Sequence, residues 1–291
     1  MKRCLQCASP FASDSWECPS CRFAPVVDEG ILVFAPDLAR EIAGYETRLF
    51  ERHGGEQAER SFWTPARAAL IVWALGRYVP RARRFLEIGC GTGGVLARLE
   101  EAFPDLELVG AEALVAGLRV AETRLSRTLL MQFDATRIPF AGEFDAVGAF
   151  DVIEHIPEDD KVLASMATAL VPEGILLVTV PQHPFLFGPA DVSARHERRY
   201  TAAGLVAQVQ RLGLRIECVT SFVSILFPAM AAVRLIAKWR SGPYDSAEEF
   251  KIGPLNDLFA RIMDLERWTI RQGMRWPAGG SLLVVARKSP A

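Results

Sequence analysis

Two groups of residues in this chain have types and spacings that could carry out chemistry. The first is a set of four cysteines in the pattern C-x2-C-x10-C-x2-C, at Cys4, Cys7, Cys18 and Cys21. The second is the stretch AFDVIEH, residues 149–155, which places two carboxylates and an imidazole within five positions at the end of an apolar run. The cysteines have the spacing of metal ligands. The second group fits a metal site, an acid/base pair or the wall of a cofactor pocket.

The cysteine pattern predicts a zinc ribbon over residues 1–35. A two-residue spacer turns both sulfurs of a pair to the same side, so four thiolates can converge on one Zn²⁺. Two disulfides or a redox-active pair are the alternatives. No export signal is evident, and no strand–helix pattern follows either pair as a thioredoxin-like site requires. A segment this small is expected to depend on its metal for folding.

The composition is that of an ordinary globular protein without a global attraction to polyanions. Of 291 residues, 50% are hydrophobic and 23% charged, and the formal net charge is −2. Any nucleic acid would therefore have to meet a local basic patch. The beginning of the chain has no apolar run of signal-peptide length. The most apolar stretch, residues 222–233, has twelve residues, whereas a bilayer-spanning helix needs about 20, so we expect a cytoplasmic protein without a transmembrane segment.

Strand-like and helical patterns alternate after residue 81. Short and almost wholly apolar runs stand at residues 85–88, 106–110, 129–131, 144–150, 175–180, 214–220 and 281–287. Helical periodicity marks most of the segments between them. Apolar strands that alternate with helices are typical of a parallel sheet with both faces covered. The predicted fold class is therefore α/β, with a doubly wound, Rossmann-like sheet of seven strands.

The remaining segments are expected to flank or interrupt this sheet. Residues 36–80 are predicted to be a linker that ends in a docking helix, with Thr64 as its N-cap and Pro65 in its first turn. Residues 81–291 form the main domain. A mostly helical insertion at about 221–280 precedes the last strand, because apolar residues recur at helical spacing from Leu255 to Gln272.

A glycine-rich turn follows the first strand of the main domain. The stretch FLEIGCGTGG, residues 85–94, satisfies both G-x-G-x-G and the dinucleotide pattern G-x-G-x-x-G. In either case the glycines let the backbone pass close to a ligand at the carboxyl edge of the sheet. Glu112, at the end of the second strand, can accept both hydroxyls of a ribose with either cofactor. The turn and Glu112 therefore leave the choice between a nicotinamide dinucleotide and S-adenosylmethionine open.

Three features favour S-adenosylmethionine. Glu87 stands two residues before the first glycine, where a carboxylate suits an ammonium group and would repel a pyrophosphate. Asp134 and Ala135, just past the third strand, suit an adenine, because a carboxylate accepts from the exocyclic amine and a backbone N–H donates to the ring. AFDVIEH then follows at the fourth strand. With LEIGCGTGG, VGAEAL, FDATRIPF, AFDVIEHI and VPEGILLVTVP, residues 60–220 resemble the class I S-adenosylmethionine-dependent methyltransferases.

This resemblance implies a role for each matching position. The methionine moiety would be held by Glu87, Gly89 and Gly91, with Cys90 in the same turn. The ribose would be bound by Glu112, which replaces the aspartate commoner in the family, and the adenine by Asp134 and Ala135. Phe150 and Asp151 would lie beside the sulfonium. In the docking helix, Trp63 and Arg67 either close over the cofactor or are a packed aromatic and a solvated arginine.

The histidines mark the expected acceptor side. His155 and His183 are the candidate catalytic bases, with a hydrogen-bonded structural role as the alternative for each. His196 lies in the charged stretch 195–199, which is either a solvated loop or a local site for phosphate or carboxylate. D-x-x-E-H also resembles the E-x-x-E-H arrangement of some ubiquinone-pathway and small-RNA methyltransferases. That similarity would place Mg²⁺ or Mn²⁺ at Asp151, Glu154 and His155, but Asp151 is shorter than glutamate, so we favour a site without an ion.

Three hypotheses describe the substrate. The first is a small-molecule or lipid-like acceptor, because the apolar segment 221–236, with Arg234, Lys238 and Arg240 at its end, suits an apolar pocket or a membrane surface as well as a core helix. The second is ribosomal or transfer RNA, because a zinc ribbon joined to such a domain resembles ribosomal-RNA guanine methyltransferases. The ribbon is not strongly basic, however, which ranks RNA second. The third is a non-catalytic cofactor-binding or adaptor protein.

Overall fold

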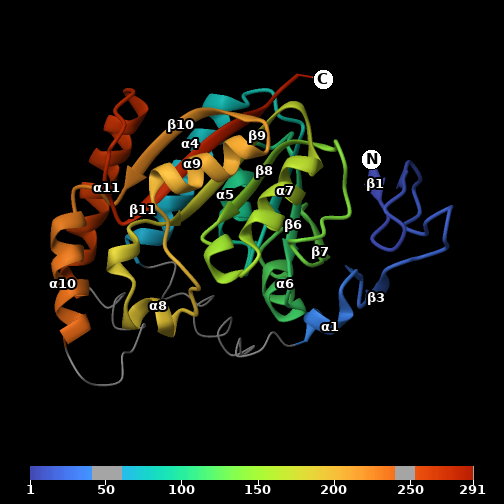
Figure 1. Cartoon of the computed structure of the whole chain (residues 1–291), viewed down its shortest axis with the longest axis horizontal. Coiled ribbons are helices and arrows are strands. Elements are labelled where there is room, and N and C mark those ends of the chain that lie inside the picture. The colour runs from blue at the N-terminus through green and yellow to red at the C-terminus, as the bar shows by residue number, and fades with distance from the viewer. Residues whose placement is uncertain (41–60, 240–252, 291) are drawn as a thin grey trace.

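A single mixed sheet organises the chain. The computed structural model describes residues 1–40, 61–239 and 253–290 (Figure 1). In these residues the sheet has nine strands in the order β10-β11-β9-β8-β5-β6-β7-β4-β3. Their bounds are β3 Val26–Asp28, β4 Ile31–Val33, β5 Arg84–Ile88, β6 Glu107–Glu112, β7 Leu129–Gln132, β8 Phe144–Phe150, β9 Leu170–Pro181, β10 Leu214–Phe222 and β11 Ser281–Lys288. Seven of them are the predicted strands, and β3 and β4 extend the sheet beyond β7.

The direction of the strands changes along the sheet. β5 to β9 pair in parallel, as the sequence predicts. β11 is antiparallel to both β9 and β10, so the expectation of a parallel sheet is wrong at that edge. β11 runs in the opposite direction to β9 and β10 and lies between them. An antiparallel strand does not need the crossover connection that a parallel strand requires.

Two hydrophobic clusters cover the two faces of the sheet. Neighbouring residues of a strand point to opposite faces, so Phe85 belongs to one cluster and Leu86 to the other. The first face is covered by α4 Trp63–Tyr78, α5 Gly94–Ala102, α6 Val115–Glu122 and α11 Asn256–Arg271. The second face is covered by α7 Asp159–Ala169 and α9 Ala202–Arg211. The doubly wound α/β architecture is thus confirmed.

The docking helix α4 starts two residues earlier than predicted, with Phe62 as its N-cap. It begins at Trp63, so Thr64 lies inside its first turn and is not the N-cap. The backbone N–H of Thr64 donates to Ser61 Oγ at 3.4 Å. Part of the predicted linker, residues 41–60, lies outside the described residues.

The first forty residues form a separate small unit at one edge of the sheet (Figure 1). β1 Lys2–Arg3 and β2 Pro10–Phe11 pair as an antiparallel hairpin, and α1 Pro36–Ala39 follows β4. β4 pairs with β3 on one side and, in parallel, with β7 on the other. The segment predicted to close the ribbon is therefore also a strand of the main sheet.

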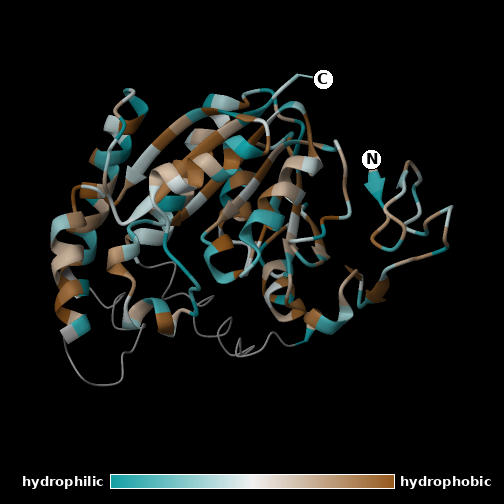
Figure 2. Cartoon of the chain, viewed as in Figure 1, coloured by the Kyte–Doolittle hydropathy of each residue, from teal (hydrophilic) through white to brown (hydrophobic). Residues whose placement is uncertain are grey.

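The described part of the insertion before β11 is mostly helical, as predicted. It contains α10 Phe227–Trp239, the short 3-10 helix η4 Gly253–Leu255, and α11. α10 turns Val233 and Ile236 outward, with 64% and 59% of their surfaces exposed, and its apolar colour is visible in Figure 2. Within the described part of the chain, no helix combines the length and the apolar character needed to cross a bilayer. Arg240 lies outside the described residues.

Candidate active site

The predicted cofactor residues lie in a row along one edge of the sheet. β8, β5, β6 and β7 are adjacent and parallel, so their carboxyl ends meet at the same edge. The chain runs outward from β5 to β7 and then returns to β8 on the other side of β5. Such a switch point is where open α/β sheets bind ligands. In sheet order the row is Asp151, Glu87, Glu112 and Asp134.

The glycine turn after β5 depends on two of its glycines. Gly89 has φ +66°, and a Cβ there would lie 2.5 Å from Val152 Cγ2. A larger residue at position 89 would therefore be strained and would collide with the chain after β8. Gly91 has φ +53°, and a Cβ there would meet nothing within 4 Å. The backbone at Gly91 thus borders open space, where a ligand could approach it closely.

Glu87 is a buried carboxylate beside this turn. It is 3% exposed, and its Oε2 accepts no hydrogen bond from the described residues. Burial raises the pKa of Glu87 to about 8; Arg67 opposes this rise and Glu112 adds to it. Buried carboxylates without a partner are unfavourable unless they are protonated or meet a cation. Glu87 is therefore suited to pair with a ligand ammonium group.

The two strands beside β5 leave room next to Glu87. Glu87 pairs with Gly110 of β6 and with Gly148 of β8. A Cβ at Gly148 would lie 2.5 Å from the Phe150 ring, and one at Gly110 would lie 3.1 Å from Cys90 Sγ. Because both positions lack side chains, Phe150 and Cys90 can occupy the space over these strands. Two more predicted cofactor residues are thus brought towards Glu87.

Glu112 is fixed by the backbone around it. Its Oε2 accepts from Gly91 N at 3.1 Å, and its Oε1 accepts from Ala113 N at 2.8 Å and Leu114 N at 3.3 Å. Burial raises the pKa of Glu112, although these N–H groups act in the opposite direction. The carboxylate is oriented before any ligand arrives, and its remaining lone pairs suit a pair of hydroxyl donors.

Asp134 shapes the loop after β7. Its Oδ1 accepts from Thr136 N at 2.8 Å, and its carbonyl oxygen accepts from Arg137 N at 2.9 Å. This local hydrogen bonding produces a tight turn. Ala135 follows directly and packs against the hydrophobic cluster of the second face.

The docking helix contributes a charge partner to the row. Arg67 Nη1 forms an ion pair with Asp151 Oδ2, and it also donates to Phe150 O at 3.4 Å. Asp151 has φ +57°, an uncommon backbone conformation for a residue other than glycine. Trp63 stacks on Phe222, with ring centroids 5.1 Å apart. The interpretation of Arg67 as a solvated arginine is therefore wrong, whereas Trp63 is a packed aromatic.

Glu154 and two histidines gather next to the row. Glu154 lies in the 3-10 helix η1 Ile153–His155 and is fully buried. Neither of its carboxylate oxygens accepts a hydrogen bond from the described residues. Burial, with a further contribution from Asp151, raises the pKa of Glu154 well above its usual value. The sequence suggested Glu154 as an ion ligand or as part of an acid/base pair on the substrate side, but it did not predict the burial of this residue, which depends on later segments of the chain.

His155 is close to His196, another of the histidines that the sequence predicts on the acceptor side. The two rings make an edge-to-face contact at 4.8 Å, and His155 Nδ1 is 3.2 Å from Arg195 O. Burial and the neighbouring His196 lower the pKa of His155 to about 4. Donor atoms of Glu154, His155 and His196 lie within 4.8 Å of one another. Among the described residues, this close group contains His196 and does not contain Asp151.

A buried aspartate holds the charged loop. Asp191, in α8 Pro189–Ser193, accepts from Arg199 Nε at 2.7 Å and from His196 Nδ1 at 2.9 Å, and Arg234 Nη1 lies 3.4 Å away. Burial opposes ionisation, but these three partners still lower the pKa of Asp191. Arg198 pairs with Asp159 at 2.8 Å. Arg198 and Arg199 of this loop therefore bind internal carboxylates. No motif near Asp191 in the sequence predicts its role.

His183 lies among aromatic side chains. It precedes the 3-10 helix η2 Pro184–Leu186, and its ring is 5.3 Å from Phe185 and 4.8 Å from Phe227. Its Nε2 is buried and has no hydrogen-bond partner in the described part of the chain. Burial, with a smaller contribution from Arg199, lowers the pKa of His183. His183 thus lies against the start of α10.

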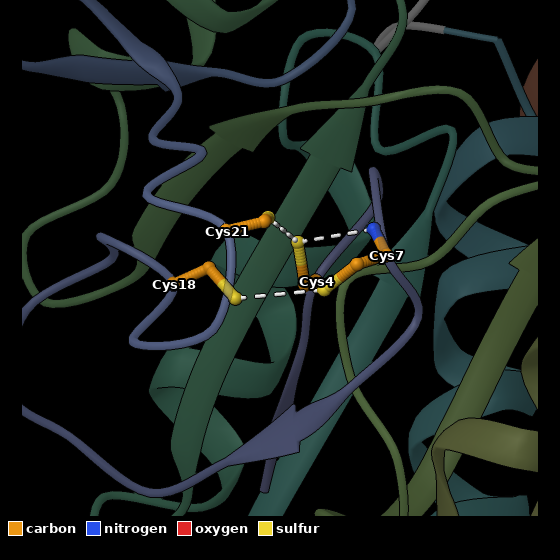
Figure 3. A group of neighbouring side chains, drawn as sticks. All are labelled: Cys4, Cys7, Cys18 and Cys21. Atoms are coloured by element: carbon orange, nitrogen blue, oxygen red, sulfur yellow. Dashed lines mark hydrogen bonds between the residues drawn. The ribbon is translucent and has the colours of Figure 1, made fainter.

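The four cysteines converge as their spacing predicts (Figure 3). Cys4 Sγ lies 3.5 Å from Cys21 Sγ, and Cys7 Sγ lies 3.7 Å from Cys18 Sγ. All four are free thiols, and their sulfurs lie within 4.8 Å of one another. Sulfurs about 2.3 Å from a tetrahedral zinc ion are themselves about 3.8 Å apart. The thiol set therefore fits one Zn²⁺, and the disulfide alternative does not match these distances.

Comparisons with known proteins agree with this arrangement. A family profile described as a methyltransferase domain matches residues 55–219. The chain belongs to the methyltransferase-domain family. The matched region contains every predicted cofactor residue, and class I S-adenosylmethionine-dependent methyltransferases share its Rossmann-like fold.

Two curated relatives are methyltransferases of small molecules by name. The ubiquinone biosynthesis O-methyltransferase of Xanthomonas axonopodis pv. citri is 28% identical over 53% of this chain and 71% of its own length. The trans-aconitate 2-methyltransferase of Methylobacterium radiotolerans is 28% identical over 55% of this chain and 60% of its own length. A protein of Synechococcus is 30% identical over 45% of this chain, which is 31% of its own length. The chain thus spans from 31% to 71% of the lengths of these three relatives.

Solved structures show the same fold. Phosphoethanolamine N-methyltransferase 2 of Haemonchus contortus, in complex with S-adenosylmethionine, gives a TM-score of 0.50 at 21% identity, over 75% of this chain and 52% of that one. A second solved structure is a complex from Haloferax volcanii between the Trm112 methyltransferase activator and a putative methyltransferase. One of its chains gives a TM-score of 0.53 at 15% identity, over 84% of this chain and 98% of that one. At these identities the similarity concerns the fold alone.

The glycine turn makes a direct prediction about ligand binding. We expect Gly89→Ala to weaken binding of S-adenosylmethionine at least tenfold, because the new Cβ would collide with Val152 and the backbone has positive φ. Isothermal titration calorimetry measures the affinity. Gly142→Ala is the matched control, since Gly142 also has positive φ but lies in an exposed turn with no atom near its Cβ. Equal affinities of the two variants would contradict the assignment of this turn.

Proposed function

We propose that the protein transfers the methyl group of S-adenosylmethionine directly to a small-molecule or lipid-like acceptor. The observation that carries this proposal is the row of strand-end groups beside an open glycine turn in a methyltransferase domain. Residues 1–35 would be a zinc-bound ribbon, residues 36–80 a linker with a docking helix, and residues 81–291 the catalytic domain.

Each group of the row has a proposed ligand moiety. Glu87 would pair with the ammonium group of the methionine moiety, which would supply the partner that its buried oxygen lacks. The backbone of Gly89, Cys90 and Gly91 would pass beneath that moiety. Glu112, already oriented, would accept from the ribose hydroxyls. At the two ends of the row, the adenine would meet Asp134 and Ala135, and the sulfonium would lie beside Phe150 and Asp151.

The chemical step needs little more than orientation. A lone pair of the acceptor attacks the methyl carbon, the carbon–sulfur bond breaks, and its electron pair stays on sulfur as the neutral thioether of S-adenosylhomocysteine. The sulfonium is already activated, so alignment of the two reactants supplies much of the rate. An acceptor that carries a proton also needs a base to receive it.

Once it has lost its own proton, Glu154 would be a stronger base than His155 for that proton. A pKa near 4 makes the neutral His155 ring a weak base. Glu154 has a raised pKa, and its buried oxygens have no hydrogen-bond partner in the described chain. His183, with its unpartnered Nε2, is the second candidate. The catalytic histidines expected from the sequence are thus joined by a carboxylate.

Two observations support a small or apolar acceptor over RNA. The relatives named above are methyltransferases of ubiquinone biosynthesis and of trans-aconitate. Lys2, one of the few basic residues of the ribbon, bonds to the backbone carbonyls of Asp14 and Ser15 at 3.0 Å and lies over the Trp16 ring at 4.5 Å. The Lys2 ammonium group therefore makes contacts within the ribbon, and this leaves the ribbon with little positive charge for binding the phosphates of RNA.

A lipid-like acceptor is supported by the surface around α10. Val233, Leu235 and Ile236 are exposed on this helix. His183 contacts Phe227 at its start. The apolar surface thus begins next to a candidate base, where a long apolar acceptor would enter.

Labelled methyl groups identify the acceptor class. The protein is incubated with S-adenosylmethionine labelled in its methyl group and, separately, with a lipid extract, a pool of small metabolites and total RNA. We expect label in the lipid or metabolite fraction, and none with Gly89→Ala. If the label appeared only in RNA, RNA would replace a small-molecule or lipid-like acceptor as the favoured substrate class. Tight cofactor binding without transfer to any fraction would favour the non-catalytic adaptor.

The base assignment predicts the behaviour of one variant. Glu154→Gln is expected to lower kcat by about 10²- to 10⁴-fold, the usual contribution of a positioned base, with S-adenosylmethionine affinity unchanged within about twofold. His155→Gln, as the comparison, should lower kcat less, because its pKa of about 4 already makes it a weak base. Steady-state kinetics and calorimetry separate the two effects. A normal kcat in Glu154→Gln would exclude this role.

Cofactor affinity should also depend on pH through Glu87. At pH 7 a carboxyl group with a pKa of about 8 is mostly protonated and must lose its proton to pair with an ammonium. Affinity for S-adenosylmethionine should therefore rise up to about tenfold per pH unit from pH 6 towards 8, with release of a proton. Calorimetry in buffers of different ionisation enthalpy measures both quantities. Glu87→Gln should bind more weakly at pH 8, without this pH dependence, and a flat wild-type profile would rule out the pairing.

A further inference from the structure

The predicted ribbon of residues 1–35, called the cysteine unit below, contacts the loop that follows Asp134. Arg3 N donates to Pro139 O at 2.9 Å, and Ala141 N donates to Met1 O at 2.9 Å. Lys2 and Phe140 form an antiparallel bridge between these two bonds. The first strand of the unit thus pairs, main chain to main chain, with residues 139–141. This segment lies only a few residues beyond the turn made by Asp134.

Side chains reinforce this contact. Arg137 Nη2 donates to Leu5 O, the carbonyl next to Cys4. Trp16 packs edge-on against Phe140 at 5.4 Å and against Phe34 at 4.9 Å. Trp16 therefore contacts both the loop, at Phe140, and the residue that directly follows β4, Phe34.

A second contact reaches the turn at Glu112. Gln132, at the end of β7, is fully buried. Its Oε1 accepts from Ala35 N at 3.0 Å, and its Nε2 donates to Ala35 O at 3.0 Å and to Ala113 O at 2.8 Å. Ala113 N in turn donates to Glu112 Oε1. One amide side chain thus ties the chain after β4 to the residue proposed to hold the ribose.

The cysteine unit has little else to hold its shape. Its own buried cluster contains Cys4, Phe11 and Cys18, and two of these three carry the converging thiols. A segment with so small a core needs a metal or other cross-link to stay folded. Loss of the metal would therefore release Arg3, Leu5 and Trp16 from the loop after Asp134.

We infer that the metal-bound cysteine unit is a positioning element for the adenosine half of the cofactor site, acting on residues 134–141 and, through Gln132, on the Glu112 turn. This inference rests on the proposed cofactor site. It gives the ribbon a role inside the methyltransferase itself, independent of any contact with RNA. Metal content and cofactor affinity are then coupled, because the loop must be ordered before it can bind adenosine.

Two ligands locate the effect. S-adenosylhomocysteine contains both halves of the cofactor, whereas 5′-methylthioadenosine contains the adenosine and lacks the amino-acid carbons and charges. Calorimetry of the full chain, zinc-loaded and after removal of zinc with a chelator, gives both affinities. We expect removal to raise both Kd values at least tenfold and by the same factor. Unchanged affinity, or full binding by a protein purified without zinc, would overturn the inference.

Trp16→Ala tests the same coupling with the cysteines intact. We expect one zinc per chain by metal analysis, a Kd raised about five- to tenfold for both ligands, and faster amide hydrogen exchange confined to residues 134–141. Glu17→Ala is the matched control, because Glu17 pairs only with Arg22 at the exposed surface of the ribbon among the described residues; both Kd values should stay within twofold. If Trp16→Ala weakened the binding of S-adenosylhomocysteine but not of 5′-methylthioadenosine, the result would contradict an effect on the adenosine half of the site. If the zinc-loaded wild type binds neither ligand, the cofactor site itself is wrong.

Discussion

The site depends on the parallel pairing of β5 between β6 and β8. This register places Glu87 opposite Gly110 and Gly148 and brings the ends of the strands to one edge. Because side chains on a strand alternate between faces, a shift of one residue would move Glu87 to the other face and replace it with an apolar neighbour. The two flanking glycines then leave space that larger residues would close. The position of every strand-end group follows from this pairing.

The site also concentrates ionisable groups away from water. Glu87 and Glu154 are buried with unsatisfied oxygens, and Glu112 is held by backbone N–H groups. Arg67 supplies a positive charge from α4, yet the pKa values of these carboxyl groups stay raised because burial dominates. Such an arrangement stores free energy that a cationic ligand can recover on binding. The same groups that make the free protein less stable therefore make it receptive to a sulfonium cofactor.

The cysteine unit completes an edge that the methyltransferase sheet would otherwise expose. β4 adds to β7 in parallel, so backbone groups of β7 are satisfied there. The joint lies beside the end of the row that is proposed for adenosine, and β10 and β11 lie at the other end of the sheet. The cysteine unit thus lies at one end of the sheet, and the helices α10 and α11 of the insertion lie at the other (Figure 1). The proposed acceptor side lies towards the second end, where α10 meets His183.

Sequence alone determined the parts of this protein that depend on local pattern. Strand and helix order, the glycine turn, the carboxylates at strand ends and the cysteine spacing are set by residues a few positions apart, and the structure places each where its pattern predicted. Tertiary structure decided the contacts between distant segments. Arg67 meets Asp151 across 84 positions, and Ala35 meets Gln132 across 97. Sequence periodicity does not predict such pairs, because the two partners come into contact only when the chain has folded. Tertiary structure also decided the burial of Glu154 and Asp191 and the antiparallel direction of β11. Each of these depends on the segments that pack around the residue or strand, and less on its neighbours in sequence.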